Sequence, residues 1–257
     1  AWDMTLKGLW HLRRSTQHDF SESLRLLEQA TRVDRGFALP WSYIALVRFE
    51  LALKGWTEVA GGAIEGTFRD MLEAASTSLE LDPSDWMAHA LMSAGELWTN
   101  YSFSKARMHA DRAIELNPSG SMAYHFSGCI YGFAGDLQTA IARQELAYRV
   151  DPAYDHSDVV QADLGLWHLL AGDFERAARH LERAISLNPS NLRARQRQVA
   201  LAGCVGDSAL AESAVRELRA LGGVMNESYL AASYPFRDAR HAVVFRNGLL
   251  KAGLLEP

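Results

Sequence analysis

Leu81-Asp82-Pro83 is an apolar-Asx-Pro motif, and the same motif occurs three more times along the chain. This repetition decides the fold. The other three copies are Leu116-Asn117-Pro118, Val150-Asp151-Pro152 and Leu187-Asn188-Pro189. Their prolines lie 35, 34 and 37 residues apart. A repeat of this length is one supersecondary unit, which buries its apolar face only against its neighbours. The sequence therefore predicts a stack of helical hairpins rather than one globular core.

The fourth repeat shows most clearly how a hairpin is encoded. Gly128 on its first helix and Ala140 on its second are small, so the two helices can approach closely. Gly135 suits the turn between the helices, and Pro152 ends the second helix. This spacing resembles the tetratricopeptide repeat (TPR). The resemblance implies an all-α fold, a right-handed α-solenoid of about six helical hairpins with a C-terminal capping helix.

The repeat boundaries predict a single solenoid over residues 1–257, with about thirteen helices and no sheet. The last helix is expected over residues 238–250, with Ala242, Val243, Phe245 and Leu249 on its apolar face. The expected units are a degenerate first repeat (1–35), a second repeat (36–84) with an inserted loop at 54–67, a third (85–118), a fourth (119–152), a fifth (153–189), a sixth (190–223) and a C-terminal cap (224–257).

Both flanks of the repeats carry a second resemblance. The opening is Ala1-Trp2-Asp3-Met4-Thr5-Leu6-Lys7-Gly8-Leu9-Trp10-His11-Leu12, and the ending contains Tyr234-Pro235-Phe236-Arg237-Asp238. Together they resemble the C-terminal TPR regions of bacterial class III adenylate cyclases and winged-helix transcription regulators. In those families the output domain precedes the repeats. The resemblance implies a regulatory, sensory part that follows such a domain, in the cytoplasm or, in a membrane-tethered regulator, in the periplasm.

Composition and motifs argue against several classes of function. The net charge of −5 makes direct binding to nucleic acid unfavourable, and no apolar run is long enough for membrane insertion. The chain has no Gly-rich phosphate loop, no His-Glu-x-x-His and no Gly-x-Ser-x-Gly motif. Cys129 and Cys204 fit no metal or redox spacing. We therefore expect no enzyme, no catalytic residue and no cofactor in this chain.

The first helix of each TPR hairpin lines a concave groove, which is the expected site of partner binding. The lining is largely apolar, so it suits an amphipathic helix or an extended peptide, and the partner could be the chain's own N-terminal output domain. Alternatively, a tight superhelix or the C-terminal segment covers the groove. The candidate partner-binding residues are Phe49, Met87, Trp98, Met122, His125, Phe133, Leu166, Leu170, Arg193 and Arg197.

Two polar groups within this lining have alternative interpretations. Arg193 and Arg197 share a helix face and could hold a phosphate or an acidic tail, but a solvated face with local salt bridges is favoured. His125 and Cys129 also share a face, but two ligands make no metal site and no carboxylate is evident nearby.

Two other functions remain open. One is a small-molecule sensor, with a pocket near Trp98, Met122, His125 and Phe133. The other is a structural spacer or dimerisation element.

Overall fold

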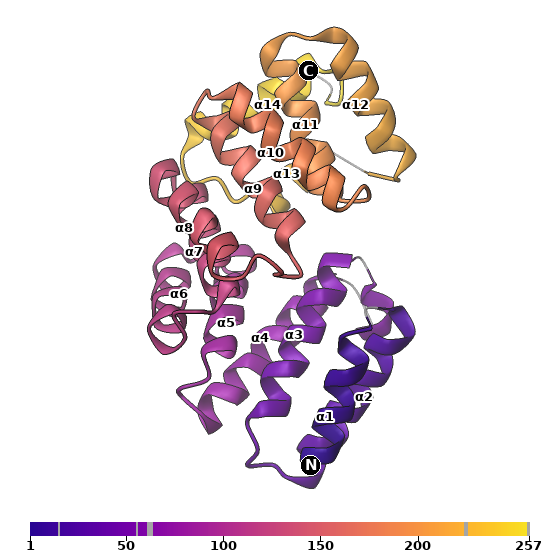
Figure 1. The fold of residues 1–257 in the computed structure, drawn as a ribbon, viewed down its shortest axis with the longest axis vertical. Coiled ribbons are helices and arrows are strands. Elements are labelled where there is room, and N and C mark those ends of the chain that lie inside the picture. Colours follow the sequence, from indigo (N-terminus) through magenta and orange to yellow (C-terminus); the bar gives the residue numbers. More distant parts are fainter. Residues whose placement is uncertain (15, 55, 61–63, 224–225, 256–257) are drawn as a thin grey trace. The chain divides into compact units, whose positions relative to one another are not determined.

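The computed structural model describes residues 1–14, 16–54, 56–60, 64–223 and 226–255. Within these ranges the chain forms fourteen α-helices and one short 3-10 helix, and no strand occurs among them. The all-α prediction is therefore confirmed. The helices fall into two compact units, residues 1–118 and 119–257. Each unit is built from consecutive helical hairpins (Figure 1).

The first unit contains three hairpins, formed by α1 with α2, α3 with α4, and α5 with α6. Each hairpin packs on the next through α2 with α3 and α4 with α5. Its elements are α1 (Trp2–Leu12), α2 (Gln17–Val33), α3 (Leu39–Lys54), η1 (Thr57–Ala60), α4 (Ile64–Leu81), α5 (Trp86–Trp98) and α6 (Phe103–Leu116).

The second unit contains three further hairpins, formed by α7 with α8, α9 with α10, and α11 with α12, followed by two more helices. The first helices of its hairpins also contact one another, α7 with α9 and α9 with α11. Its elements are α7 (Ser121–Ala134), α8 (Leu137–Val150), α9 (Ser157–Leu170), α10 (Phe174–Leu187), α11 (Leu192–Val205), α12 (Ser208–Ala220), α13 (Glu227–Ser233) and α14 (Ala239–Lys251).

The recurring apolar-Asx-Pro motif forms the turn between successive hairpins. In two copies the Asp side chain, at Asp82 or Asp151, accepts the backbone N–H of the residue after the proline, at 2.9 and 3.0 Å. Asn188 does the same at 3.1 Å. Proline has no N–H of its own, so the Asx side chain satisfies the next donor along the chain while the proline stops the helix.

A Gly-Asp pair makes the turn inside each hairpin of the second unit. Gly135 and Gly206 adopt positive φ angles of 106° and 77°, which only glycine takes without strain. The aspartate that follows caps the next helix: Asp136 and Asp207 accept the N–H groups of Thr139 and Leu210 at 3.0 and 2.9 Å. These turns appear where the sequence predicts them.

Small residues let the paired helices cross closely, as the sequence predicts. A Cβ atom on Gly128 would lie 2.8 Å from Cγ of Gln144 on α8, so this position admits only glycine without a shift. Ala140 is fully buried. Between hairpins, Ala147, Val160 and Leu164 form a cluster that joins α8 to α9. The cores of the hairpins thus continue from one repeat to the next within the unit.

Three local features differ from the prediction. The second helix of the second repeat begins at Ile64 rather than at the expected Phe68. Part of the predicted loop at 54–67 forms η1, while residues 55 and 61–63 lie outside the described residues. The helix α13 is not predicted at all. Among the described helices, none combines the length and the apolar character that crossing a bilayer requires.

Candidate functional site

The chain's own C-terminal segment, here residues 226–255, covers the first helices of the second unit. Its helix α14 packs on α11 and reaches α9. The backbones nearly touch there, since a Cβ atom on Gly203 would lie 1.9 Å from the carbonyl oxygen of Gly248. The groove formed by α7, α9 and α11 is therefore occupied by this segment, which is one of the alternatives that the sequence left open.

An aromatic cluster anchors the C-terminal segment to the groove. The ring of Phe133 on α7 lies 5.3 Å from that of Phe236 and 6.4 Å from that of Tyr234. Phe245 of α14 closes the cluster, 4.7 Å from Tyr234 and 5.8 Å from Phe236. Trp167 of α9 packs edge-on against Phe133 at 5.1 Å. Aromatic rings packed in this way contribute a large apolar contact area between the segment and the groove.

Three hydrogen bonds hold residues 233–237, which run from the last residue of α13 into the link to α14, against the groove. The N–H of Arg237 donates to the carbonyl oxygen of Phe133 at 2.8 Å. The guanidinium of Arg193 donates to the carbonyl oxygen of Ser233 at 3.2 Å. The hydroxyl of Tyr234 donates to Oε1 of Gln196 at 3.0 Å. Groove residues thus bind the main chain at both ends of the stretch and recognise one side chain between them.

The apolar residues proposed for the groove are buried in the structure, except Trp98, which is half-buried. Phe133 lies beneath the C-terminal segment, and Met122, Leu166 and Leu170 are buried in α7 and α9. A partner could reach Phe133 only if the segment left the groove. In the first unit, Phe49 and Met87 are buried on α3 and α5, and Trp98 is the last residue of α5. Trp98 and Met122, which the sequence placed in one pocket, belong to different units.

The arginines of the sixth repeat do not form the solvated face that the sequence favoured. The Arg197 side chain is buried, with 1% of its surface exposed. It forms an ion pair with Asp163 at 2.7 Å, and its guanidinium lies over the ring of Tyr234. Arg193 is half-buried, with its guanidinium 5.5 Å from the centre of the same ring. Only Arg195 makes an ordinary local salt bridge, with Glu217. Two of the three cations therefore face the groove.

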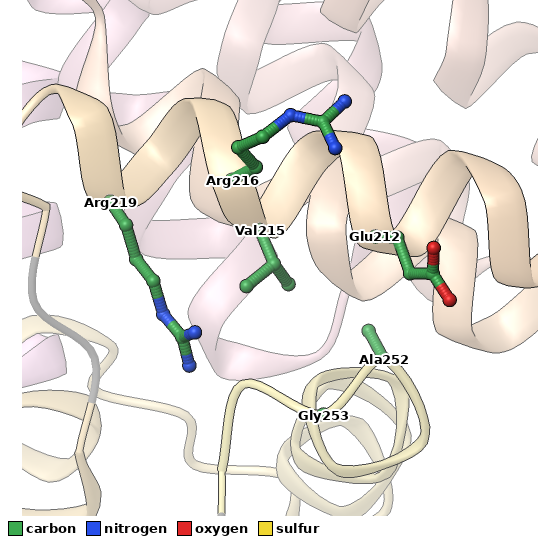
Figure 2. A pocket seen from close by; sticks show the side chains of 6 residues that line it. All are labelled: Glu212, Val215, Arg216, Arg219, Ala252 and Gly253. Carbon is green, nitrogen blue, oxygen red and sulfur yellow. The ribbon is translucent and has the colours of Figure 1, made fainter.

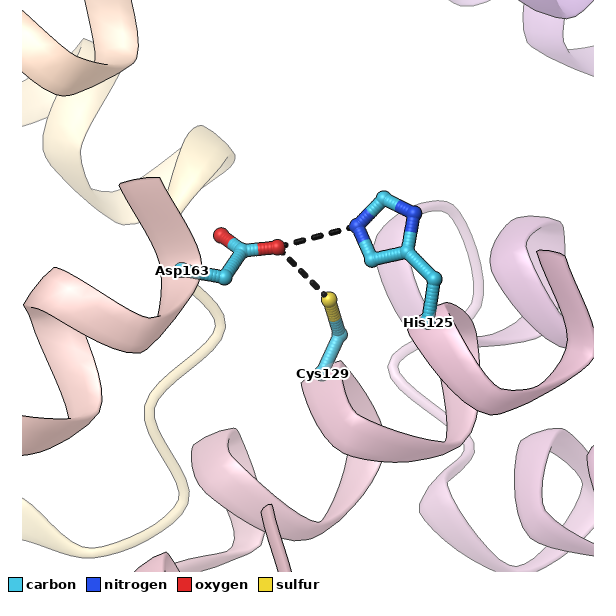
Figure 3. Close-up of side chains that lie close together, drawn as sticks. All are labelled: His125, Cys129 and Asp163. Carbon is cyan, nitrogen blue, oxygen red and sulfur yellow. Dashed lines mark hydrogen bonds and ion pairs between the residues drawn. The ribbon is translucent and has the colours of Figure 1, made fainter. Parts of the chain in front are cut away.

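A buried polar cluster lies below this groove (Figure 3). His125 and Cys129 stand one turn apart on α7 and point at Asp163 on α9. Oδ2 of Asp163 accepts from Nε2 of His125 at 3.0 Å and from Sγ of Cys129 at 3.2 Å. The sequence-based expectation that His125 and Cys129 have no carboxylate nearby is wrong, because stacking of the hairpins brings Asp163 between them.

The charge states in this cluster follow from burial and the neighbouring cation. Burial alone would raise the pKa of Asp163, but Arg197 and the hydrogen bonds from His125 and Cys129 hold it below its usual value. Burial and the Asp163 carboxylate raise the pKa of the Cys129 thiol well above its usual value. The cluster therefore contains a carboxylate, a guanidinium and a neutral thiol.

The sequence contains a signal for this cluster that amphipathic patterns do not show. Asp163 follows Cys129 by 34 residues, and Arg197 follows Asp163 by the same interval. Residues one repeat apart occupy equivalent positions on neighbouring helices, so they meet when the hairpins stack. A polar residue recurring at one repeat position thus predicts a polar cluster inside the stack.

Four histidines that look scattered in the sequence form two pairs. His89 and His109 approach with their Nδ1 atoms 2.9 Å apart, and the rings of His168 and His180 stack at 5.2 Å. His180 also donates from Nδ1 to Gln161 at 2.8 Å. Burial lowers the pKa of all four, and lowers that of His180 to about 4. They lack a nucleophile among them, so we interpret them as structural.

A shallow, open pocket of about 410 Å³ lies between α12 and the residues that follow α14 (Figure 2). Its lining combines three charged side chains of α12 with apolar or small residues. The lining residues are Glu212, Val215, Arg216, Arg219, Ala252 and Gly253. The pocket contains none of the residues of the groove or of the buried cluster.

Comparisons with known proteins address the fold. Residues 160–191 match the tetratricopeptide repeat family. No curated protein matches the sequence of the chain. Among solved structures, a chain of the APC/C hetero-tetramer Cut9–Hcn1 has a similar fold. The alignment covers 94% of this chain and 41% of that chain, at 15% sequence identity and a TM-score of 0.67.

Two further relatives in fold are aligned over most of their own length. PilW, a type IV pilus biogenesis factor, aligns over 80% of this chain and 92% of its own, at 16% identity and a TM-score of 0.58. A thermophilic TPR protein from Thermus thermophilus aligns over 76% and 95%, at 16% identity and a TM-score of 0.56. In fold, the chain is a series of TPR-type helical hairpins, and residues 160–191 carry the sequence of one such repeat.

Proposed function

We propose that this chain is a non-catalytic protein-interaction module whose groove on α7, α9 and α11 binds a short aromatic peptide. The observation that carries the proposal is the way residues 233–237 lie in that groove. The main-chain N–H of Arg237 donates to the carbonyl oxygen of Phe133, and the guanidinium of Arg193 donates to the carbonyl oxygen of Ser233. The hydroxyl of Tyr234 donates to Gln196. Contacts to main chain and to an aromatic side chain are those by which a groove recognises a peptide.

The same observation defines how binding is regulated. The chain's own segment competes with any partner, because a tethered ligand has an effective concentration of roughly millimolar. A partner therefore needs either higher affinity for the groove or a second contact that loosens the C-terminal segment. Binding in this mode converts the presence of a partner into release of α14, which is a regulatory output.

The fold relatives support an interaction role in general terms. Cut9 occurs in a complex with Hcn1, and PilW is a factor in the biogenesis of type IV pili. The flanks of this chain resemble those of TPR regions that follow adenylate cyclase or winged-helix output domains. On that resemblance we place the module in a bacterial signalling protein, in which the partner is a protein segment or the chain's own output domain. The in-frame coding sequence before residue 1 tests this placement, since it should encode such a domain.

A peptide array tests the proposed function. The chain to use carries Phe245→Glu, which places a charge in the aromatic cluster and frees the groove. We expect it to select peptides with two aromatic residues around a proline, and to prefer tyrosine to phenylalanine at the first. Adding Gln196→Ala should remove the preference for tyrosine while leaving aromatic selection intact. Selection that ignores both aromatic positions would contradict the proposal.

A further inference from the structure

The buried cluster of His125, Cys129 and Asp163 has the donor types of a metal site. It offers one nitrogen, one sulfur and one carboxylate oxygen, and all three atoms lie within 4.8 Å of one another. In a tetrahedral zinc site the ligand atoms are about 3.3–3.7 Å apart, as follows from bond lengths of about 2.0–2.3 Å. The distances of 3.0 and 3.2 Å to Asp163 need to widen by only a few tenths of an ångström.

A fourth side chain whose amide oxygen could serve as a ligand lies beside the cluster. Gln144 of α8 is fully buried, and its Nε2 lies 3.5 Å from Sγ of Cys129 and 3.4 Å from Oδ2 of Asp163. Its Oε1 has no hydrogen-bond partner. A buried amide oxygen without a partner is destabilising, because it has lost its hydrogen bonds to water. Rotation of the amide by half a turn breaks the hydrogen bond of 3.3 Å from Nε2 to the carbonyl oxygen of His125 and places Oε1 near Cys129 Sγ and Asp163 Oδ2, where a cation would satisfy it.

The surrounding residues orient the ligands as second-layer partners do in zinc sites. Nδ1 of His125 faces the hydroxyl of Tyr154 at 3.5 Å, which leaves Nε2 directed at the cluster. Arg197 binds Oδ1 of Asp163 at 2.7 Å, so Oδ2 is the oxygen that faces His125 and Cys129 and would bind the metal. The ring of His125 also stacks on Phe126 at 5.3 Å. His125 and Asp163 are thus already oriented toward the centre of the cluster, and the Gln144 amide is the group that must turn.

We propose that His125, Cys129, Asp163 and Gln144 form a binding site for one zinc ion. On binding, His125 gives up the proton at Nε2 and carries one at Nδ1, opposite the Tyr154 hydroxyl, so that the Nε2 lone pair bonds to the metal. The Cys129 S–H bond breaks, its proton leaves to solvent, and the thiolate sulfur bonds to the metal. The thiolate and the Asp163 carboxylate then face the charges of the zinc ion and of Arg197, which keeps its ion pair, so the filled site carries one net positive charge. The mixed nitrogen, sulfur and oxygen set is suited to zinc rather than to calcium or magnesium, which prefer oxygen ligands alone.

The test uses the full chain without an affinity tag, fully reduced, dialysed against zinc and then against buffer. Zinc content is measured by elemental analysis in the wild type, Cys129→Ser, Asp163→Asn and the control Cys204→Ser. Cys204 is the chain's other cysteine and lies on α11, outside the cluster. The proposal predicts one equivalent in the wild type and in Cys204→Ser, and at least about tenfold weaker binding in the other two variants.

Cobalt gives a second measurement that needs no variant to fold. A Co²⁺ ion bound as proposed must show thiolate-to-metal charge-transfer absorption and the intense visible bands of tetrahedral geometry. Both should appear in the wild type and in Cys204→Ser, and zinc should displace them. Absence of the charge-transfer band from the reduced wild type would overturn the proposal. So would zinc retention by folded Cys129→Ser at the wild-type level.

Discussion

The hydroxyl of Tyr234 donates a hydrogen bond of 3.0 Å to Oε1 of Gln196, deep in the groove of the second unit. Tyr234 is 3% exposed and belongs to the C-terminal segment, while Gln196 belongs to α11. The two residues are 38 positions apart. This contact specifies a hydroxyl-bearing ring, whereas the other hydrogen bonds between the groove and residues 233–237 are to main-chain atoms of the segment.

Tyr234→Phe should lower the free energy of unfolding by about 1 kcal/mol, because it removes this hydrogen bond and leaves the ring packing intact. Urea denaturation measures the change. Tyr101→Phe is the matched control, since the Tyr101 side chain is half exposed in the other unit and its loss of a hydroxyl should have no measurable effect. Equal effects of the two substitutions would show that the Tyr234 hydroxyl contributes nothing specific.

Gly203→Ala should displace α14 from α11. The added Cβ would lie 1.9 Å from the backbone oxygen of Gly248, and no side-chain rotation relieves a clash with backbone. We expect destabilisation by about 3 kcal/mol and faster amide hydrogen exchange in residues 239–251. Gly66→Ala is the control: nothing lies within 4 Å of its Cβ position in α4, so it should stabilise the chain by up to about 1 kcal/mol. Unchanged exchange in Gly203→Ala would contradict the close packing of α14.

Ala140→Leu tests the crossing of α7 and α8. Ala140 is fully buried, so three additional carbon atoms should overpack the crossing and destabilise the chain by about 1–3 kcal/mol. A thermal melt monitored by circular dichroism reports the loss. A melting curve identical to that of the wild type would mean that these two helices are not packed as described.

His180 should make the folded chain sensitive to acid. Burial lowers its pKa to about 4 from an unfolded value near 6.5, so the unfolded state binds protons first as the pH falls. The stability that neutral His180 contributes is therefore complete above pH 6.5 and is lost between about 6.5 and 4. Between pH 6.5 and 4, the free energy of unfolding of His180→Gln should therefore fall less than that of the wild type, by on the order of 1–2 kcal/mol. Denaturant titrations at several pH values measure it, and an unchanged pH slope would exclude His180 as its source.

Much of the fold follows from the sequence because each hairpin repeats the same turn and helix-ending residues. Gly135 and Asp136 make a turn by their own conformational preferences, and Asp151 with Pro152 ends a helix without help from distant residues. The interval between such signals fixes the number and order of hairpins. Local chemistry of this kind is readable from a single sequence.

The occupied groove and the buried cluster could not be predicted in the same way. Tyr234 meets Phe133 only because the chain folds back across about a hundred residues, and no local pattern in residues 233–237 indicates that return. Within α14, Phe245 and Leu249 are buried as predicted, but Val243 is 54% exposed, because α14 meets α11 along a narrower face than its apolar pattern suggests. The apolar pattern of the groove positions does not reveal the contact between Cys129 and Asp163. That contact follows from their separation of one repeat, 34 residues, which places them on neighbouring helices.

The central claim is that the groove of α7, α9 and α11 is a peptide-binding site held by the chain's own C-terminal segment. The most direct measurement is the affinity of a synthetic peptide of residues 226–255 for the Phe245→Glu chain, by isothermal titration calorimetry. We predict binding at least about tenfold tighter than to the wild type, whose own segment competes, and loss of binding when Phe133→Glu is added. A Phe245→Glu chain that keeps its helical circular dichroism yet binds no peptide, or binds it equally well with Phe133→Glu, would contradict the account.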